Sequence, residues 1–123
     1  MSKLRVFDEN EISARLARDL PKWTYENGAI SRTFRTENWK GALMVVNTIG
    51  HLAEAAWHHP DLHVTYSSVT VRLNTHDAGG VTDRDMALAS RIEDVVMWRP
   101  GLTGGPLESA PAGPAYAYLH YDD

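Results

Sequence analysis

His58, His59 and His76 are the residues of this chain whose type and spacing best suit chemistry. Glu54 lies four positions before His58, so on a continuing helix the carboxylate and the imidazole share a face and can touch. His59 precedes Pro60, which biases it away from helical backbone, so the histidine pair is expected at a rigid helix exit. His76 follows a predicted strand. Three imidazoles at the ends of elements can therefore meet in one cleft.

Three imidazoles could bind zinc, transfer protons or have only structural roles. A zinc site is disfavoured because adjacent histidines rarely ligate one ion and no HExxH pair is present. Acid–base chemistry suits imidazole better, because its ordinary pKa lies near neutrality and neither a metal nor a nucleophile is then required. The residues alone leave a structural alternative open, in which His58 and His59 cap the helix end and His76 lies in a surface loop.

The composition narrows the function classes further. The chain has 123 residues and a formal net charge of −4, which fits one domain without the basic stripe of a nucleic-acid binder. It has no cysteine, which excludes disulfides, thiolate metal sites and a cysteine nucleophile. No apolar run approaches the ~20 residues of a membrane span, and the first residues lack the apolar core of a signal peptide. A cytoplasmic protein without a membrane partner is expected.

The elements that must position the histidines follow from periodicity. Apolar residues at helical spacing predict a long amphipathic helix over residues 38–57, ended by Pro60. A short helix is expected before it, up to Pro21, and Asn27-Gly28 predicts the turn of a β-hairpin. 

The second half of the chain continues this pattern. Alternation predicts two half-buried strands, one over Leu62–Tyr66 and one over Val69–Leu73, separated by Ser67-Ser68. Residues Thr82–Asp85 fit a capping box that opens a last helix. The apolar face of that helix is expected to carry Ala89, Ile92, Val95 and Val96.

This order of elements predicts an α+β fold, with a four-stranded, mainly antiparallel sheet and three helices packed on one of its faces. Residues 1–97 are expected to form this domain. Residues 98–123 form an extension, irregular over Pro100–Gly113 because it is rich in proline and glycine. Its end, Ala115–Tyr121, has an alternating side-chain pattern like that of a β-strand. It is expected to add an edge strand or to dock on a partner.

The motif residues together resemble those of the pterin-4a-carbinolamine dehydratases. In chain order they are Glu54, His58-His59-Pro60, Tyr66, the run from Val69 to His76, and the run from Gly80 to Asp85. The resemblance extends from about Val6 to Val96. It implies the same α+β fold, a pterin as the substrate, no cofactor, and assembly into homodimers or homotetramers. Trp39, Leu43 and Met44, left over on the long helix, also point to a subunit interface.

The resemblance also implies a reaction and roles for the site residues. The family removes the 4a-hydroxyl of a tetrahydropterin carbinolamine as water and is therefore a group of hydro-lyases. By position, His58 and His76 are the acid–base pair, and His59 holds the substrate. Glu54 orients His58. Asp85 supports the site, although a capping-box carboxylate at the start of the last helix is the simpler explanation and needs no substrate.

Two further features bear on function. Trp23 and Trp57 are expected in the core rather than against the pterin. The residues after about Met97 depart from the family pattern and are similar to the extended tails of dehydratase-like proteins of α-carboxysomes, which are proposed as Rubisco assembly factors. This resemblance implies an alternative function: a carboxysome-associated Rubisco chaperone in which dehydratase activity is absent.

Overall fold

The computed structural model describes residues 4–121. Residues 1–3, part of the start considered for a signal peptide, and residues 122–123 lie outside the described range. The elements follow in the order α1 (Glu9–Asp19), β1 (Thr24–Glu26), β2 (Ala29–Arg35), α2 (Trp39–Ala56), β3 (Asp61–Thr65), β4 (Ser68–Leu73), the 3-10 helix η1 (His76–Ala78), α3 (Asp83–Val96) and the 3-10 helix η2 (Pro100–Leu102).

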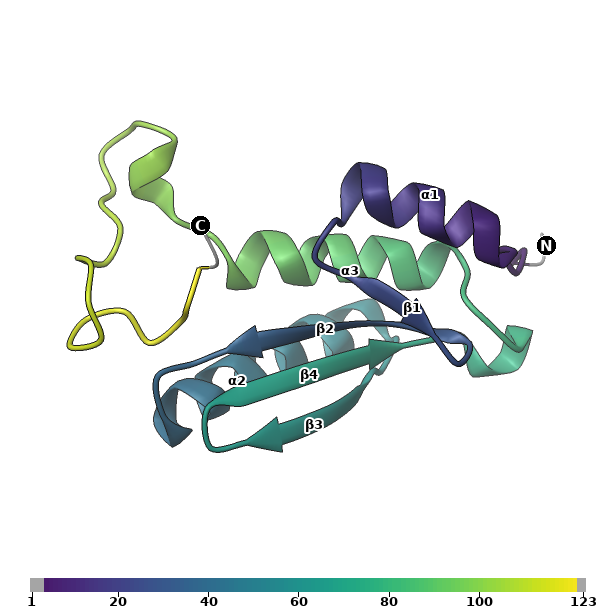
Figure 1. Ribbon diagram of the computed structural model, residues 1–123, viewed down its shortest axis with the longest axis horizontal. Coiled ribbons are helices and arrows are strands. Elements are labelled where there is room, and N and C mark those ends of the chain that lie inside the picture. Colours follow the sequence, from purple (N-terminus) through teal and green to yellow (C-terminus); the bar gives the residue numbers. More distant parts are fainter. Residues whose placement is uncertain (1–3, 122–123) are drawn as a thin grey trace.

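The four strands form one antiparallel sheet in the order β1-β2-β4-β3 (Figure 1). Successive side chains point to opposite faces. On one face the neighbouring strands β2 and β4 pair Ile30 with Leu73 and Phe34 with Val69, and all of these side chains are buried. On the other face Thr33 is exposed. The sheet thus packs the helices against one face only, which confirms the predicted α+β fold.

Two helices, α2 and α3, cover the buried face. Figure 1 shows α2 running behind the sheet, with α3 alongside it. The buried residues of these helices recur at helical spacing: Ala42, Val45, Ile49 and Ala53 on α2, and Leu88, Ala89, Ile92 and Val96 on α3. Val95, predicted on this face, is 39% exposed because it lines a groove between α2 and α3. Within the described residues, none of the helices is long and apolar enough to cross a membrane.

The turn between β3 and β4 comes one residue earlier than the alternation predicted. Thr65 pairs with Ser68, and their hydroxyl oxygens lie 2.6 Å apart, so Tyr66 and Ser67 form the turn. The prediction that Tyr66 belongs to a half-buried strand is wrong, because its side chain is 66% exposed. Hydrogen bonding between the residues flanking the turn outweighs the apolar pattern here.

After α3 the chain forms an extension that leaves the sheet and helices and then returns (Figure 1). Leu119 is 3% exposed and forms an isolated antiparallel bridge with Thr36, so the edge strand expected over Ala115–Tyr121 is reduced to one pair. The close approach depends on Gly41, where a Cβ atom would lie 3.1 Å from the carbonyl oxygen of Tyr118. Burial also raises the pKa of the Tyr118 phenol.

Candidate active site

The structure brings the three predicted histidines together. His58 and His59 follow α2, and His76 begins the 3-10 helix after β4. All three line one cavity of about 290 Å³. Its remaining lining residues are Trp57, Asn74, Thr75, Asp77 and Arg84. Side chains from two separate loops thus converge on one space, which is the arrangement that proton transfer to a bound molecule requires.

The end of α2 differs from the prediction and determines how the histidines point. Trp57 adopts the left-handed conformation, with φ 49° and ψ 47°, so the helix stops three residues before Pro60. For a residue other than glycine this conformation costs about 1–2 kcal/mol. The predicted contact between Glu54 and His58 is wrong, because the two no longer share a helical face. Glu54 is instead hydrogen-bonded to His59 on the surface, with 2.7 Å between Oε2 of Glu54 and Nε2 of His59.

His58 pairs with Asp85, a residue that the pattern also explained as a helix cap. The Nε2 atom of His58 lies 2.6 Å from Oδ1 of Asp85, and the Asp85 side chain is fully buried. The predicted capping box is confirmed, since the Thr82 N–H donates to Oδ2 of Asp85 over 2.9 Å. One carboxylate therefore caps α3 and holds the histidine, so the two explanations for Asp85 are not alternatives.

The hydrogen bonds around Asp85 have a fixed direction. The Thr75 hydroxyl donates to Oδ2 of Asp85 over 2.8 Å, so the Thr82 hydroxyl, also 2.8 Å away, must donate to Thr75. The Thr82 hydroxyl in turn accepts from the Arg84 N–H. Every bond then ends at the carboxylate, which as an ionised group can only accept. It follows that Nε2 of His58 carries a hydrogen and donates it to Asp85.

His76 is held by its backbone rather than by its side chain. Thr75, just before it, is buried and pairs with Gly80 through an isolated antiparallel bridge. Gly79 closes the loop with φ 83°, a conformation in which glycine has no steric penalty. The His76 side chain is exposed. The loop therefore fixes the backbone position of His76 and leaves its ring accessible from the cavity.

Several lining residues were not singled out from the sequence. Asn74 and Arg84 lie within the motif runs but were given no role in the site, and Asp77 follows His76 directly, so their place in or beside the motif was the available signal. The predicted core position of Trp57 is wrong, since its side chain is 76% exposed, whereas Trp23 is buried as predicted. 

The acidic and imidazole groups of the site do not assemble into a metal centre. Among the described residues, no three His, Asp or Glu side chains are grouped so that they could hold a metal ion. The histidines are instead paired one by one with carboxylates, His58 with Asp85 and His59 with Glu54. Such pairing holds each ring in one orientation.

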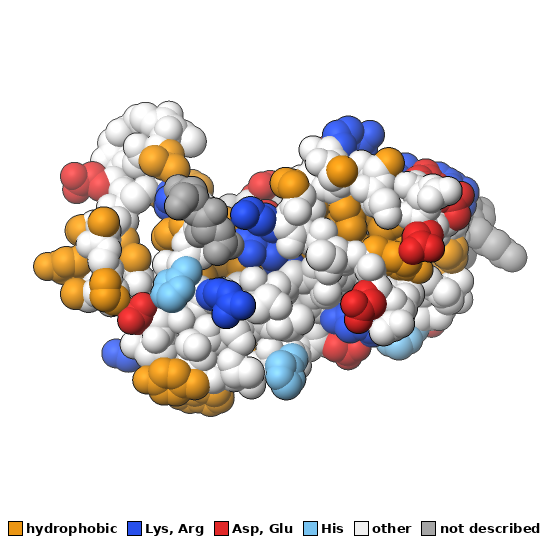
Figure 2. Space-filling model, in the orientation of Figure 1, with side chains coloured by type: hydrophobic (Ala, Val, Ile, Leu, Met, Phe, Trp, Pro, Cys, Tyr) orange, Lys and Arg blue, Asp and Glu red, His pale blue; other side chains and the backbone are white. Residues whose placement is uncertain are grey.

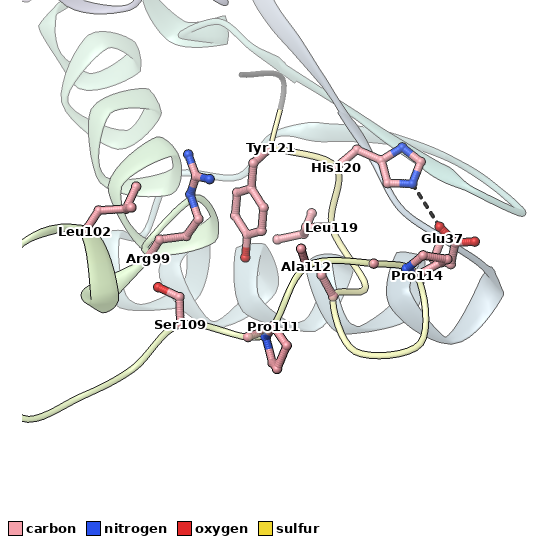
Figure 3. A pocket seen from close by; sticks show the side chains of 13 residues that line it. Glu37, Arg99, Leu102, Ser109, Pro111, Ala112, Pro114, Leu119, His120 and Tyr121 are labelled. Carbon is pink, nitrogen blue, oxygen red and sulfur yellow. Dashed lines mark hydrogen bonds and ion pairs between the residues drawn. The ribbon is translucent and has the colours of Figure 1, made fainter.

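Larger cavities lie outside the histidine site, among them one of about 410 Å³ that is lined by residues of α1 and α3 and shares no residue with the site. Two others adjoin the histidine site or the extension. One, of about 650 Å³, lies between α2 and α3 and shares His58 and Arg84 with the site. The other, of about 500 Å³, lies between the extension and the domain. Figure 3 shows His120 turned toward Glu37 at its rim, and their side chains are 3.0 Å apart. None of these cavities gathers the three histidines.

Comparisons with known proteins identify the family of the chain. The family model described as pterin 4 alpha carbinolamine dehydratase matches residues 5–95. A relative from Aquifex aeolicus that carries the family's name is 45% identical over 93 residues, which are 76% of this chain and 93% of the relative. A relative of the same name from Chloroflexus aurantiacus is 47% identical over 88 residues, which are 72% of this chain and 94% of the relative.

A solved structure of the family shows the same fold. A transcriptional coactivator/pterin dehydratase from Brucella melitensis has a TM-score of 0.69 and 29% identity, covering 75% of this chain and 99% of that chain. A pterin dehydratase-like RuBisCO assembly factor of the α-carboxysome has a TM-score of only 0.49 and 15% identity, which is too distant to bear on function. On the matches over residues 5–95, the chain belongs to the pterin 4 alpha carbinolamine dehydratase family.

Proposed function

We propose that this protein is a hydro-lyase that dehydrates a pterin-4a-carbinolamine. The 4a-hydroxyl of the tetrahydropterin leaves as water, and the quinonoid dihydropterin is the product. The observation that most supports this is the convergence of His58, His59 and His76, the histidines of the family pattern, on one cavity of about 290 Å³. The pairing of His58 with buried Asp85 supports it further.

The chemistry assigns each histidine a task. The C4a–O bond breaks with its electron pair going to oxygen, so an acid must deliver a proton there. The lone pair of a ring nitrogen forms the new C=N bond, so a base must remove that nitrogen's proton. With Nε2 of His58 held by Asp85, Nδ1 is the atom that exchanges a proton with substrate. His76 is the second member of the pair, and His59, oriented by Glu54, positions the pterin.

A direct assay tests this function. The 4a-carbinolamine, generated in place by an aromatic amino-acid hydroxylase, loses water slowly in buffer, and its decay is followed by ultraviolet absorbance. We expect the purified protein to accelerate the decay in proportion to its concentration. A preparation of correctly folded protein that leaves the rate equal to that in buffer would refute the proposal.

A second candidate function, binding of a protein partner, is supported by the extension. Large apolar side chains there are strongly exposed: Trp98 at 60%, Leu102 at 69%, Leu107 at 57% and Tyr116 at 66%. Figure 2 shows apolar side chains gathered on this part of the surface. Exposed apolar groups of this size are typical of interaction sites. The resemblance of the extension makes Rubisco, in a carboxysome, the partner to test.

Deleting residues 98–123 tests both the domain boundary and this second candidate. We expect the domain to remain folded and to keep its dehydratase activity, because no residue of the extension lines the histidine cavity. Its free energy of unfolding should fall by about 1–2 kcal/mol, since burial of Leu119 is lost while the extension no longer has to be ordered. Denaturant unfolding and the dehydration assay provide the measurements.

Two single substitutions in the full chain are matched controls for this deletion. Leu119→Ser should reproduce most of the stability loss, whereas Leu107→Ser, on an exposed side chain, should leave stability unchanged. A deletion variant that is unfolded or inactive would contradict the boundary at residue 97. Rubisco yield on co-expression that is the same with and without the extension would contradict the second candidate.

The start of α2 supports self-association. Trp39, Leu43 and Met44 are 47%, 40% and 45% exposed, so three large apolar side chains of this helix face outward. Exposed apolar side chains close together on a surface helix are typical of a subunit contact. A homodimer or homotetramer is therefore part of the proposal.

A further inference from the structure

Trp57 is a large apolar side chain in a conformation that its own packing does not explain. It ends α2 with positive φ, a position at which glycine or asparagine is usual. Burial does not compensate for this, because the side chain is 76% exposed. Asparagine would satisfy the backbone there at less cost. The reason for an indole at this position therefore lies in what it contacts at the surface.

The position of the ring indicates what that is. Trp57 lines the cavity of the three histidines and contacts His59 edge to face, with ring centroids 5.1 Å apart and planes at 81°. The other described residues that line this cavity are polar. His59 is itself hydrogen-bonded to Glu54. The carboxylate, the imidazole and the indole therefore form a continuous row of contacts at the rim. The cavity thus offers polar groups for proton transfer and a single flat apolar wall.

We propose that Trp57 is the stacking surface for the planar pyrimidine part of the substrate and thereby sets the preference of the site for flat heterocycles; this inference rests on the proposed function. Indole rings bind heterocyclic bases through their faces, largely independently of hydrogen bonding. Stacking of one face of the heterocycle on Trp57 leaves the other face, from which the 4a-hydroxyl projects, and the ring N–H beside it accessible to His58 and His76. In this arrangement Trp57 binds and the histidines react.

The Trp57→Asn variant removes the indole without disturbing the fold, because asparagine tolerates the left-handed backbone. We expect its melting temperature to be no lower than that of the wild type. The KM for the carbinolamine should rise about tenfold, with kcat nearly unchanged, because an indole–heterocycle stack is lost while the acid–base groups remain. The affinity for 7,8-dihydrobiopterin, measured by equilibrium dialysis, should weaken by the same factor. Trp57→Phe should recover most of the affinity.

The matched control is Trp98→Asn, which removes a comparably exposed indole that does not line the cavity. It should leave KM and dihydrobiopterin affinity at wild-type values. Wild-type KM and affinity in Trp57→Asn would overturn the proposal. So would a change in sedimentation coefficient that accompanies the loss of affinity, because the indole would then serve a subunit contact.

The two assays also separate this inference from the proposed function. A wild-type protein that binds dihydrobiopterin through Trp57 but does not accelerate dehydration would refute the dehydratase and support the stacking surface. A wild-type protein that neither binds the pterin nor accelerates the reaction would overturn both. If the wild type is active and Trp57→Asn has the same KM, only the stacking surface is overturned.

Discussion

Replacing Asp85 with asparagine is expected to lower kcat for dehydration by about 10²- to 10⁴-fold while the protein stays folded. Asparagine can still accept from Thr75 and Thr82 through its oxygen, but it then turns its NH₂ group toward Nε2 of His58. That nitrogen must lose its hydrogen, and the proton moves to Nδ1, the atom that the proposed mechanism uses. The substitution therefore changes the tautomer of His58 and leaves the imidazole in place.

The same substitution should also affect stability. Asp85 is fully buried and caps α3, so replacement of its charge should lower the free energy of unfolding by about 1–3 kcal/mol. Asp83→Asn is the matched control, since Asp83 lies in the same first helical turn with its side chain 75% exposed. It should change neither activity nor stability by a measurable amount.

Nitrogen-15 NMR of labelled histidine distinguishes the tautomer effect from a merely structural one. The wild type should show hydrogen on Nε2 of His58, and Asp85→Asn should show it on Nδ1. An Asp85→Asn protein that keeps the wild-type tautomer and kcat would contradict the role of Asp85 as a positioning residue. Denaturant unfolding of the same samples establishes that the protein remains folded.

His76→Ala should reduce kcat/KM by about 10²- to 10⁴-fold, because one of the two proton-transferring groups is lost. Its side chain is exposed and its loop is held by backbone contacts, so the free energy of unfolding should stay within about 0.5 kcal/mol of the wild type. His58→Ala should lose as much activity and also about 3–5 kcal/mol of stability, since it leaves the buried charge of Asp85 without its partner.

His63→Ala is the control for both histidine variants. His63 is an exposed histidine of β3 and does not line the cavity. It should behave as the wild type in the dehydration assay and in denaturant unfolding. A His76→Ala protein with wild-type kcat/KM would show that the proposed acid–base pair is wrong, whatever the activity of the wild type.

The elements of the fold could be predicted from the sequence because their causes are local. The period of apolar residues on α2, the Asn27-Gly28 turn and the Thr82–Asp85 capping box each depend on neighbours within a few positions. The errors fall where a local pattern competes with a contact. Tyr66 continues an apolar alternation but lies in the turn, and Trp57 continues a helical period but ends the helix.

The sequence by itself therefore determined the α+β fold, the family and the three histidines. Only the tertiary structure decided which carboxylate pairs with which histidine, and that the indole of Trp57 faces solvent beside them. The reason is physical. One left-handed residue at the end of α2 redirects the chain, so His58 leaves the helical face of Glu54 and meets Asp85, 27 residues further on. Spacing along a helix predicts contacts only as far as the helix continues.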